Sequence, residues 1–226
     1  MKSTVVIGAG VGGLAAAIEL AAAGHQVDVL ERCDEPGGKM RQLSVAGRGV
    51  DAGPTVFTMR WIFDALLAHA NTTLENELAL LPAEVLARHA WTRGGCLDLF
   101  ASIDRSAEAI EAFAGDRDAN AYREFCRRSA AVYETLRDPF IASPRPGMLD
   151  LVRRVGFGRL DELWRTAPFQ SLWNALGRQF NDPRLRQLFG RYATYVGSSP
   201  LKAPATLMLI AHVEQDGVWL VDGGMR

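Results

Sequence analysis

The sequence predicts an α/β fold that opens with a strand, a helix and a second, parallel strand. Residues 4–7 form a short β-branched run that ends at a glycine, a pattern typical of a buried parallel strand. Apolar side chains then recur at helical spacing over residues 14–21, and Gly24 stands where a glycine commonly closes a helix. Residues 26–30 alternate between polar and apolar side chains, which indicates the second strand.

Between the first strand and the helix lie four glycines at the spacing of a dinucleotide-binding turn: Gly8, Gly10, Gly12 and Gly13. Gly8 permits the tight turn, Gly10 lets a pyrophosphate approach the backbone, and Gly13 lets helix and strand pack closely. The helix amino terminus offers free N–H groups and a partial positive charge to phosphates. Glu31 follows Gly13 by 18 residues, where a carboxylate binds an adenosine ribose and disfavours the 2′-phosphate of NADP. We therefore predict a Rossmann-like FAD/NAD(P)-binding fold.

Two other interpretations of this stretch account for fewer residues. Lys2 precedes an apolar run to Ala23 that resembles a secretory signal peptide, but Glu19 interrupts the run and the glycine spacing is left unexplained. A plain glycine-rich turn does not account for the strand, the helix and the acid in their order.

The composition is that of an ordinary globular protein and excludes several functional classes. The chain has 226 residues, of which 48% are hydrophobic and 23% charged, with a net charge of −1. Proteins that bind nucleic acid usually gather a basic excess into a patch, so no nucleic-acid partner is expected. Cys33, Cys96 and Cys126 are widely spaced and fit neither a disulfide framework nor a metal site, which favours the cytoplasm. The oligomeric state is left open.

The residues after Glu31 carry a second glycine motif. Arg32 follows directly, and residues 35–41 read Glu-Pro-Gly-Gly-Lys-Met-Arg. This segment resembles the flavoprotein superfamily of amine oxidases, protoporphyrinogen oxidases and phytoene desaturases. The resemblance implies that the segment runs along the pyrophosphate and ribityl chain of FAD, where Lys39 or Arg41 offsets phosphate charge. A solvated loop is the alternative.

Two further stretches are similar to carotenoid desaturases in particular. Residues 50–55 read Val-Asp-Ala-Gly-Pro-Thr, which is similar to a stretch near the flavin in those enzymes. The order of motifs in residues 191–225 resembles the bacterial hydroxycarotenoid 3,4-desaturases (methoxyneurosporene dehydrogenases). Together, the glycine turn and the resemblance give these predicted cofactor-binding residues: Gly8, Gly10, Gly12, Gly13, Glu31, Arg32, Gly38, Lys39, Met40, Arg41, Gly53, Pro54 and Thr55.

The resemblance implies an FAD-dependent oxidoreductase that desaturates an acyclic carotenoid, a hydrophobic polyene, by hydride transfer to flavin N5. The protein binds FAD, aligns the polyene and excludes water in such a reaction. The four histidines are scattered and no Ser/His/Asp, Cys/His or metal constellation is present, so we nominate no catalytic base and expect no metal. The alternatives are another flavoprotein of the amine oxidase/protoporphyrinogen oxidase superfamily, a carotenoid isomerase, or an inactive truncated fragment.

The resemblance also implies two domains. Residues 1–83 are expected to form the amino-terminal part of the FAD-binding domain. Residues 84–226 are expected to form part of a substrate-binding domain of α+β type. We expect the carboxyl-terminal FAD-binding segment to be absent, which leaves the Rossmann-like fold incomplete.

Within the second predicted domain, residues 85–90 and 97–101 indicate a hairpin, and a helix is expected from residue 106 to residue 113. Two apolar helical stripes follow, made of Tyr122, Phe125, Cys126, Ser129, Tyr133 and Leu136, and of Phe169, Leu172, Trp173, Leu176 and Phe180. Such stripes are most simply core, and a polyene tunnel is the alternative. Residues 144–160 mix apolar side chains with arginines, which indicates either a solvated face or peripheral contact with the inner face of the cell membrane.

Overall fold

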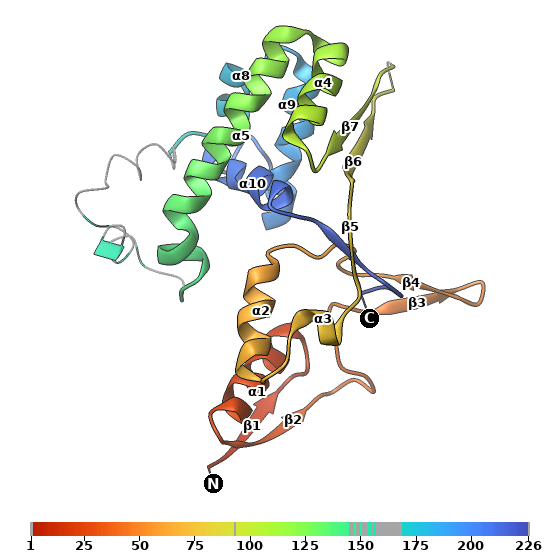
Figure 1. Ribbon diagram of the computed structural model, residues 1–226, viewed down its shortest axis with the longest axis vertical. Coiled ribbons are helices and arrows are strands. Elements are labelled where there is room, and N and C mark those ends of the chain that lie inside the picture. The colour runs from red at the N-terminus through yellow and green to blue at the C-terminus, as the bar shows by residue number, and fades with distance from the viewer. Residues whose placement is uncertain are drawn as a thin grey trace. The chain divides into compact units, whose positions relative to one another are not determined.

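The chain forms two compact units in the computed structural model (Figure 1). The structure describes residues 2–92, 94–144, 147, 150, 153–154, 156 and 169–225. The first unit contains Met1–Ala83 and Gly217–Arg226, and the second contains Glu84–Asp216. The amphipathic segment predicted at residues 144–160 therefore lies mostly outside the described residues.

The last ten residues belong to the first unit, which differs from the domain boundary expected from the sequence. We expected all of residues 84–226 in one domain, but residues 217–226 are grouped with the first unit. The reason is a pair of antiparallel strands. Strand β5 (Leu80–Pro82) pairs with β8 (Trp219–Val221), with Leu80 opposite Val221.

The first unit begins with the predicted strand–helix–strand motif. Strands β1 (Ser3–Ile7) and β2 (Gln26–Leu30) pair in parallel, from Ser3 opposite Gln26 to Ile7 opposite Leu30. Helix α1 (Val11–Ala22) connects them. Gly24 follows the helix with a φ of +83°, a conformation that favours glycine. The two strands, the helix and the parallel pairing are thus confirmed.

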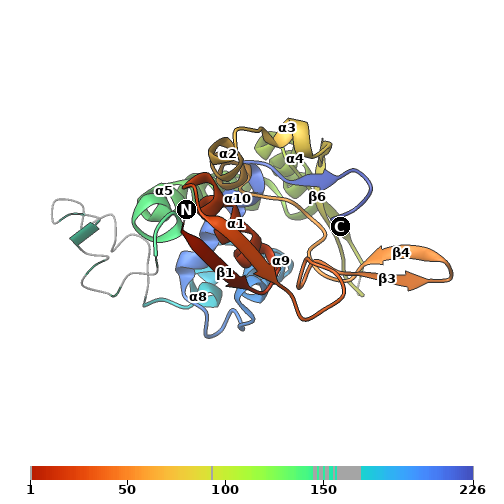
Figure 2. The ribbon, with the colours of Figure 1, turned by 90° about the horizontal axis from the view of Figure 1, so that it is seen from below.

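The remaining elements of the first unit are short. They are β3 (Gln42–Val45) and β4 (Arg48–Asp51), which form an antiparallel hairpin (Figure 2), followed by α2 (Arg60–His69) and α3 (Leu74–Glu77). Helix α2 packs against α1, and Nδ1 of His69 lies 2.8 Å from Oε1 of Glu19. Helix α1 thus packs on the parallel strand pair, and α2 packs on α1.

The second unit is mainly helical, with one antiparallel hairpin. The hairpin consists of β6 (Val85–Ala90) and β7 (Cys96–Phe100), which confirms the prediction. The helices are α4 (Ile103–Ala114), α5 (Asp116–Leu136), η1 (Arg137–Ile141), α8 (Leu172–Gln179), α9 (Pro183–Gly190), η3 (Arg191–Val196), η4 (Ala205–Met208) and α10 (Leu209–Gln215). Helix α4 begins earlier than predicted because the Ser102 side chain caps it, accepting a hydrogen bond from the amide of Arg105. No helix in the described ranges is long and apolar enough to span a membrane.

The core of the second unit is rich in aromatic rings. The ring of Phe189 lies 4.9 Å from those of Phe125 and Phe180, measured between centroids. The stripe predicted from Tyr122 to Leu136 is buried, which confirms its place in the core. Phe169 is 78% exposed, so its predicted place in the core is wrong. It precedes the serine cap of α8 and so lies outside the helix whose stripe it was expected to share.

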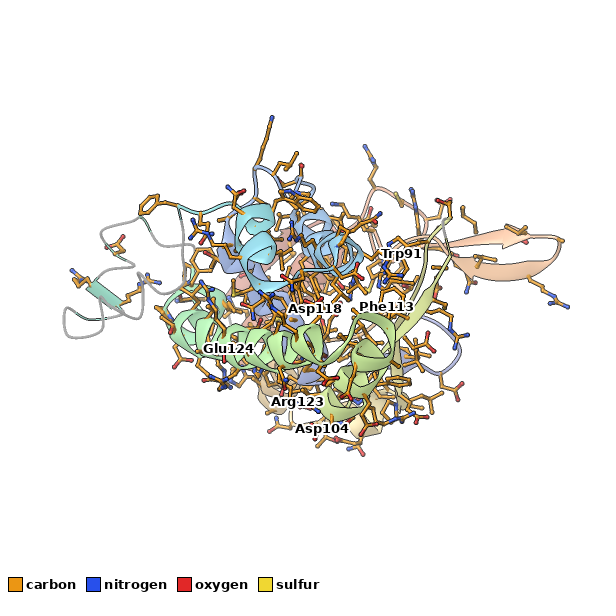
Figure 3. The ribbon with its side chains drawn as sticks, turned by 90° about the horizontal axis from the view of Figure 1, so that it is seen from above. Trp91, Asp104, Phe113, Asp118, Arg123 and Glu124 are labelled. Carbon is orange, nitrogen blue, oxygen red and sulfur yellow. The ribbon has the colours of Figure 1, made fainter. Side chains whose placement is uncertain are left out.

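Side-chain contacts also join the helices and the hairpin of the second unit (Figure 3). The rings of Trp91 and Phe113 lie 5.2 Å apart, and the guanidinium of Arg184 lies 3.8 Å from the centre of the Phe113 ring. Asp118 on α5 accepts hydrogen bonds from the amides of Asn181 and Asp182, just before α9. These contacts position α9 against α4, α5 and the hairpin.

Candidate functional site

Glycines shape the turn from β1 into α1. Gly8 has a φ of +98°, and a Cβ on Gly13 would lie 1.9 Å from the carbonyl oxygen of Gly8. Helix α1 begins with Gly10 as its N-cap, without a side-chain capping bond and without an acidic residue in its first turn. Its first backbone N–H groups therefore remain available to an anion, and the helix dipole favours an anion there.

Glu31 follows β2 and turns back to this glycine turn. Its Oε2 accepts a hydrogen bond from the amide of Ala9 at 2.7 Å, and its Oε1 accepts one from the amide of Cys33 at 2.9 Å. The bonds from Cys33 and Ala9 hold the pKa of the Glu31 carboxyl below its ordinary value, so the group is ionised at neutral pH. A charged acceptor thus lies beside the glycine turn, and its contact with a ribose stays a prediction.

The second glycine motif packs directly on the first. The amide of Gly37 donates to the carbonyl of Ala9 at 2.8 Å, and Gly10 and Gly37 form an isolated parallel bridge. A Cβ on Gly38 would lie 3.0 Å from the Cα of Gly10. The double glycine therefore allows two backbone segments to approach each other at the site.

A pocket of about 610 Å³ lies beside both glycine motifs, within the range of ligand sites. Several segments of the first unit contribute its lining residues: Gly10, Val11, Gly12, Gly37, Gly38, Lys39, Met40, Pro54, Val56, Phe57, Thr58, Phe63 and Met225. A second pocket of about 540 Å³ shares three of them and is lined by Gly38, Lys39, Arg41, Ala52, Gly53 and Pro54. The two pockets therefore join the glycine turn to the segment around Pro54.

The structure brings most of the predicted cofactor-binding residues together. Those that line one of the two pockets are Gly10, Gly12, Gly38, Lys39, Met40, Arg41, Gly53 and Pro54. Gly8 and Gly13 shape the turn instead, and Glu31 closes it. Arg32 and Thr55 are exposed and line neither pocket. Their roles in cofactor binding stay predictions.

Sequence reasoning missed seven lining residues of the larger pocket: Val11, Gly37, Val56, Phe57, Thr58, Phe63 and Met225. Gly37 was signalled by its place in the double glycine. Phe63 and Met225 carry no local signal, because tertiary structure alone brings α2 and the last residues to the glycine turn.

The larger pocket combines polar and apolar groups. The start of α1 and Lys39 are suited to an anionic part of a ligand. Phe57 and Phe63, with ring centroids 4.5 Å apart, are suited to an apolar or aromatic part, together with Met225. The pocket therefore fits a ligand that carries both phosphate and ring systems.

Replacing Gly13 by alanine is expected to destabilise the first unit. The added Cβ meets the carbonyl oxygen of Gly8, which is backbone and cannot rotate away. Overpacking of this kind costs about 1–3 kcal/mol or more. Gly12→Ala is the matched control, because a Cβ there meets nothing within 4 Å. In urea unfolding of the full-length protein, only the Gly13 variant should lose stability; equal midpoints for both variants would contradict the packing role.

Comparisons with known proteins place this site in a recognised fold. Residues 6–68 match the family described as NAD(P)-binding Rossmann-like domain. The structure of wild-type putrescine oxidase bound to putrescine aligns with 99% of this chain and 46% of its own length, at a TM-score of 0.59 and 19% identity. An oxidoreductase from Methanosarcina mazei aligns over the same shares of both chains, at a TM-score of 0.53 and 19% identity. Likeness at that identity shows the fold alone, and it confirms the Rossmann-like prediction.

Sequence relatives are much closer than these structures. Hydroxyneurosporene desaturase from Rubrivivax gelatinosus is 54% identical over 224 residues, which are 98% of this chain and 42% of the relative. The hydroxyneurosporene desaturase of Rhodobacter capsulatus is 46% identical over 223 residues, which are 98% of this chain and 45% of the relative. This chain is therefore similar to hydroxyneurosporene desaturases over almost its whole length. The predicted resemblance to bacterial carotenoid desaturases is thereby confirmed.

The homology extends to other carotenoid desaturases at lower identity. The phytoene desaturase (lycopene-forming) of Pseudescherichia vulneris is 35% identical over 225 residues, which are 99% of this chain and 44% of the relative. The chain spans less than half the length of the curated relatives that it matches.

The second unit also contains a buried polar network. Glu214, which is 6% exposed, accepts hydrogen bonds from both terminal nitrogens of Arg191, at 2.8 and 2.6 Å. It also accepts from the hydroxyls of Tyr192 at 3.2 Å and Tyr195 at 2.8 Å. Both carboxylate oxygens of Glu214 thus accept hydrogen bonds from protein side chains, and we interpret the network as structural.

His89 lies in the field of this network. Burial and the charge of Arg191 lower the pKa of His89, so this histidine is neutral at neutral pH.

Across the described part of the chain, no group of three or more His, Cys, Asp or Glu side chains is arranged to hold a metal ion.

Proposed function

We propose that this chain forms the dinucleotide-binding part of an FAD-dependent enzyme that desaturates an acyclic carotenoid. The observation that carries the proposal is that Glu31 and the double glycine both contact the glycine turn before α1. The chain in which they do so is 54% identical to a hydroxyneurosporene desaturase. Residues 1–83, together with the returning segment 217–225, would bind FAD, and the second unit would contribute to substrate binding.

The residues at the site fit an FAD molecule. The uncapped amino terminus of α1 and Lys39 offer positive potential to a pyrophosphate. Ionised Glu31 offers acceptors to ribose hydroxyls and would repel a 2′-phosphate. Gly38 and Gly10 line the pocket, and neither adds a side chain where their two backbones approach each other.

The chemistry of desaturation removes two hydrogens from adjacent carbons of the polyene. When bound, FAD would supply the two-electron acceptor: flavin N5 would take a hydride from one carbon, and the neighbouring carbon would lose a proton to solvent as the double bond forms. This chain's residues hold the cofactor by its phosphates and ribose, and the apolar wall made by Phe57, Phe63 and Met225 excludes water beside it.

The substrate is expected to be a hydrophobic polyene, as the names of the relatives indicate for those proteins. We propose a cytoplasmic protein that contacts the inner face of the cell membrane peripherally, because such a substrate dissolves in lipid. The segment predicted to make this contact, residues 144–160, has a described part of only a few residues.

Pigment analysis of cells that co-express the full-length protein with acyclic carotenoids tests the proposed reaction. The expected product has lost two hydrogens per desaturation and absorbs at longer wavelength, and the purified protein shows flavin absorbance. A product of unchanged mass would instead support a carotenoid isomerase. If the 226-residue chain purified by itself shows no flavin absorbance, that result would support an inactive fragment. Flavin without pigment change in the full-length protein would support an amine or protoporphyrinogen oxidase.

A further inference from the structure

The segment Gly217–Met225 positions two residues of the larger pocket, which is called the dinucleotide pocket below because FAD is proposed to bind there. Strand β8 within it pairs with β5, and the amide of Asp222 donates to the carbonyl of Ala79 at 2.9 Å. Trp219 and Phe57 exchange two backbone hydrogen bonds of 2.8 Å each. Phe57 is a pocket residue, and so is Met225 at the end of the segment. The shape of the pocket therefore depends on residues that are far away in the sequence.

Asp51, at the end of β4, anchors the end of this segment. Its Oδ2 accepts a hydrogen bond from the amide of Met225 at 3.0 Å. A Cβ on Gly224, whose φ is +106°, would lie 3.2 Å from the same carboxylate, so the backbone passes close to it. The other carboxylate oxygen is buried and has no partner among the described residues. The Met225 amide is thus the described contact that offsets the desolvation of Asp51.

We infer that Asp51 is a positioning residue that seats Met225 in the dinucleotide pocket and thereby couples occupation of the pocket to the order of residues 217–225. The inference rests on the proposed binding of FAD. Asp51 itself lines neither pocket, so it acts through Met225 and not through contact with the cofactor.

The coupling follows from thermodynamic linkage. A ligand that contacts Met225 binds better when the segment is seated, so binding must favour the seated state by the same factor. The position of Met225 depends on a charge-assisted hydrogen bond from its backbone amide to Asp51, which is stronger than a bond between neutral groups. Removing the carboxylate should therefore weaken FAD binding and loosen the segment together.

Hydrogen exchange and FAD titration of the full-length protein test this role. In the wild-type protein, FAD should slow amide exchange in residues 217–225. Asp51→Ala should abolish that protection and raise the dissociation constant of FAD about tenfold, the loss expected for one charge-assisted bond. Asp51→Asn keeps an acceptor oxygen but loses the charge, so it should recover only part of both effects. Asp28→Ala, which removes an exposed carboxylate of β2, is the matched control and should change neither.

The outcomes separate this inference from the proposed function. Wild-type protein that binds no FAD would overturn the proposed function itself. If the wild-type protein binds FAD but its segment 217–225 exchanges equally with and without it, the coupling is wrong. Unchanged FAD affinity in Asp51→Ala removes the positioning role. If Asp51→Ala does not fold, Gly224→Ala carries the test: it keeps the carboxylate but places a Cβ 3.2 Å from it, on a backbone whose φ of +106° disfavours alanine. Wild-type exchange and affinity in that variant would also overturn the role.

Discussion

Replacing Glu31 by alanine is expected to raise the dissociation constant of FAD roughly tenfold to a hundredfold in the full-length protein. This is the range of affinity loss expected when a single charge-assisted hydrogen bond is lost. The variant removes the acceptor proposed for the ribose. It also frees the amides of Ala9 and Cys33, which the carboxylate holds at 2.7 and 2.9 Å. Quenching of flavin fluorescence measures the affinity.

Two variants separate the charge of Glu31 from general effects on its loop. Glu31→Gln keeps the length of the side chain, but its amide nitrogen must face one of two backbone N–H donors, so it should also weaken binding. Asp34→Ala removes an exposed carboxylate from the same loop and should bind FAD as the wild type does. An unchanged dissociation constant in Glu31→Ala would exclude Glu31 from the binding site.

The pH dependence of the Glu31 contacts follows from its pKa. The bonds from Cys33 and Ala9 lower that pKa from an ordinary value of 4.5. The pKa in the folded protein is lower than in the unfolded chain. The carboxylate therefore contributes fully to the stability of the fold above pH 4.5, and this contribution is lost as the pH falls through the lowered pKa. FAD affinity should therefore show no Glu31-dependent change between neutral pH and about pH 5.

The glycine turn could be predicted from the sequence because its determinants are local. Gly8, Gly13 and Glu31 lie within one βαβ unit, and their spacing encodes the turn, the close packing and the acid at the end of β2. Helix and strand periodicities fixed the elements around them. The same local logic predicted the hairpin of the second unit.

The rest of the pocket depends on contacts that no local pattern reveals. Phe57 and Met225 line the same pocket because β8 returns to β5, about 140 residues away along the chain, and the sequence shows no periodicity for that pairing. The domain boundary expected at the end of the chain differed for the same reason. Phe169 was placed in the core because apolar spacing continued across Ser171, whereas the cap at that serine starts the helix after it.

Removing the Glu214 carboxylate is expected to destabilise the second unit by about 3–5 kcal/mol, the range for breaking a buried ion pair by deleting one partner. In Glu214→Ala the Arg191 guanidinium stays in place without the acceptor of its two bonds. The hydroxyls of Tyr192 and Tyr195 lose the same acceptor. Urea unfolding followed by tryptophan fluorescence measures the loss.

Matched variants show whether the effect belongs to the network. Glu134→Ala removes an exposed carboxylate from α5 and should unfold at the wild-type urea concentration. Tyr195→Phe deletes one of the donors to Glu214 and should cost about 1 kcal/mol, the net worth of a single hydrogen bond. If Glu214→Ala and Glu134→Ala unfold together, the network does not hold the unit.

Acid should amplify the loss in Glu214→Ala, because His89 lies in the field of the same ion pair. Burial and Arg191 lower the pKa of His89 from 6.5, whereas Glu214 raises it. A histidine with a lowered folded pKa contributes stability that is complete above pH 6.5 and is lost as the pH falls through the folded value. Without Glu214 the pKa of His89 in the folded protein falls further, so stability is lost over a pH range that extends to lower pH. The variant should therefore lose stability more steeply than the wild type below pH 6.5, and parallel pH profiles would show that His89 does not sense Glu214.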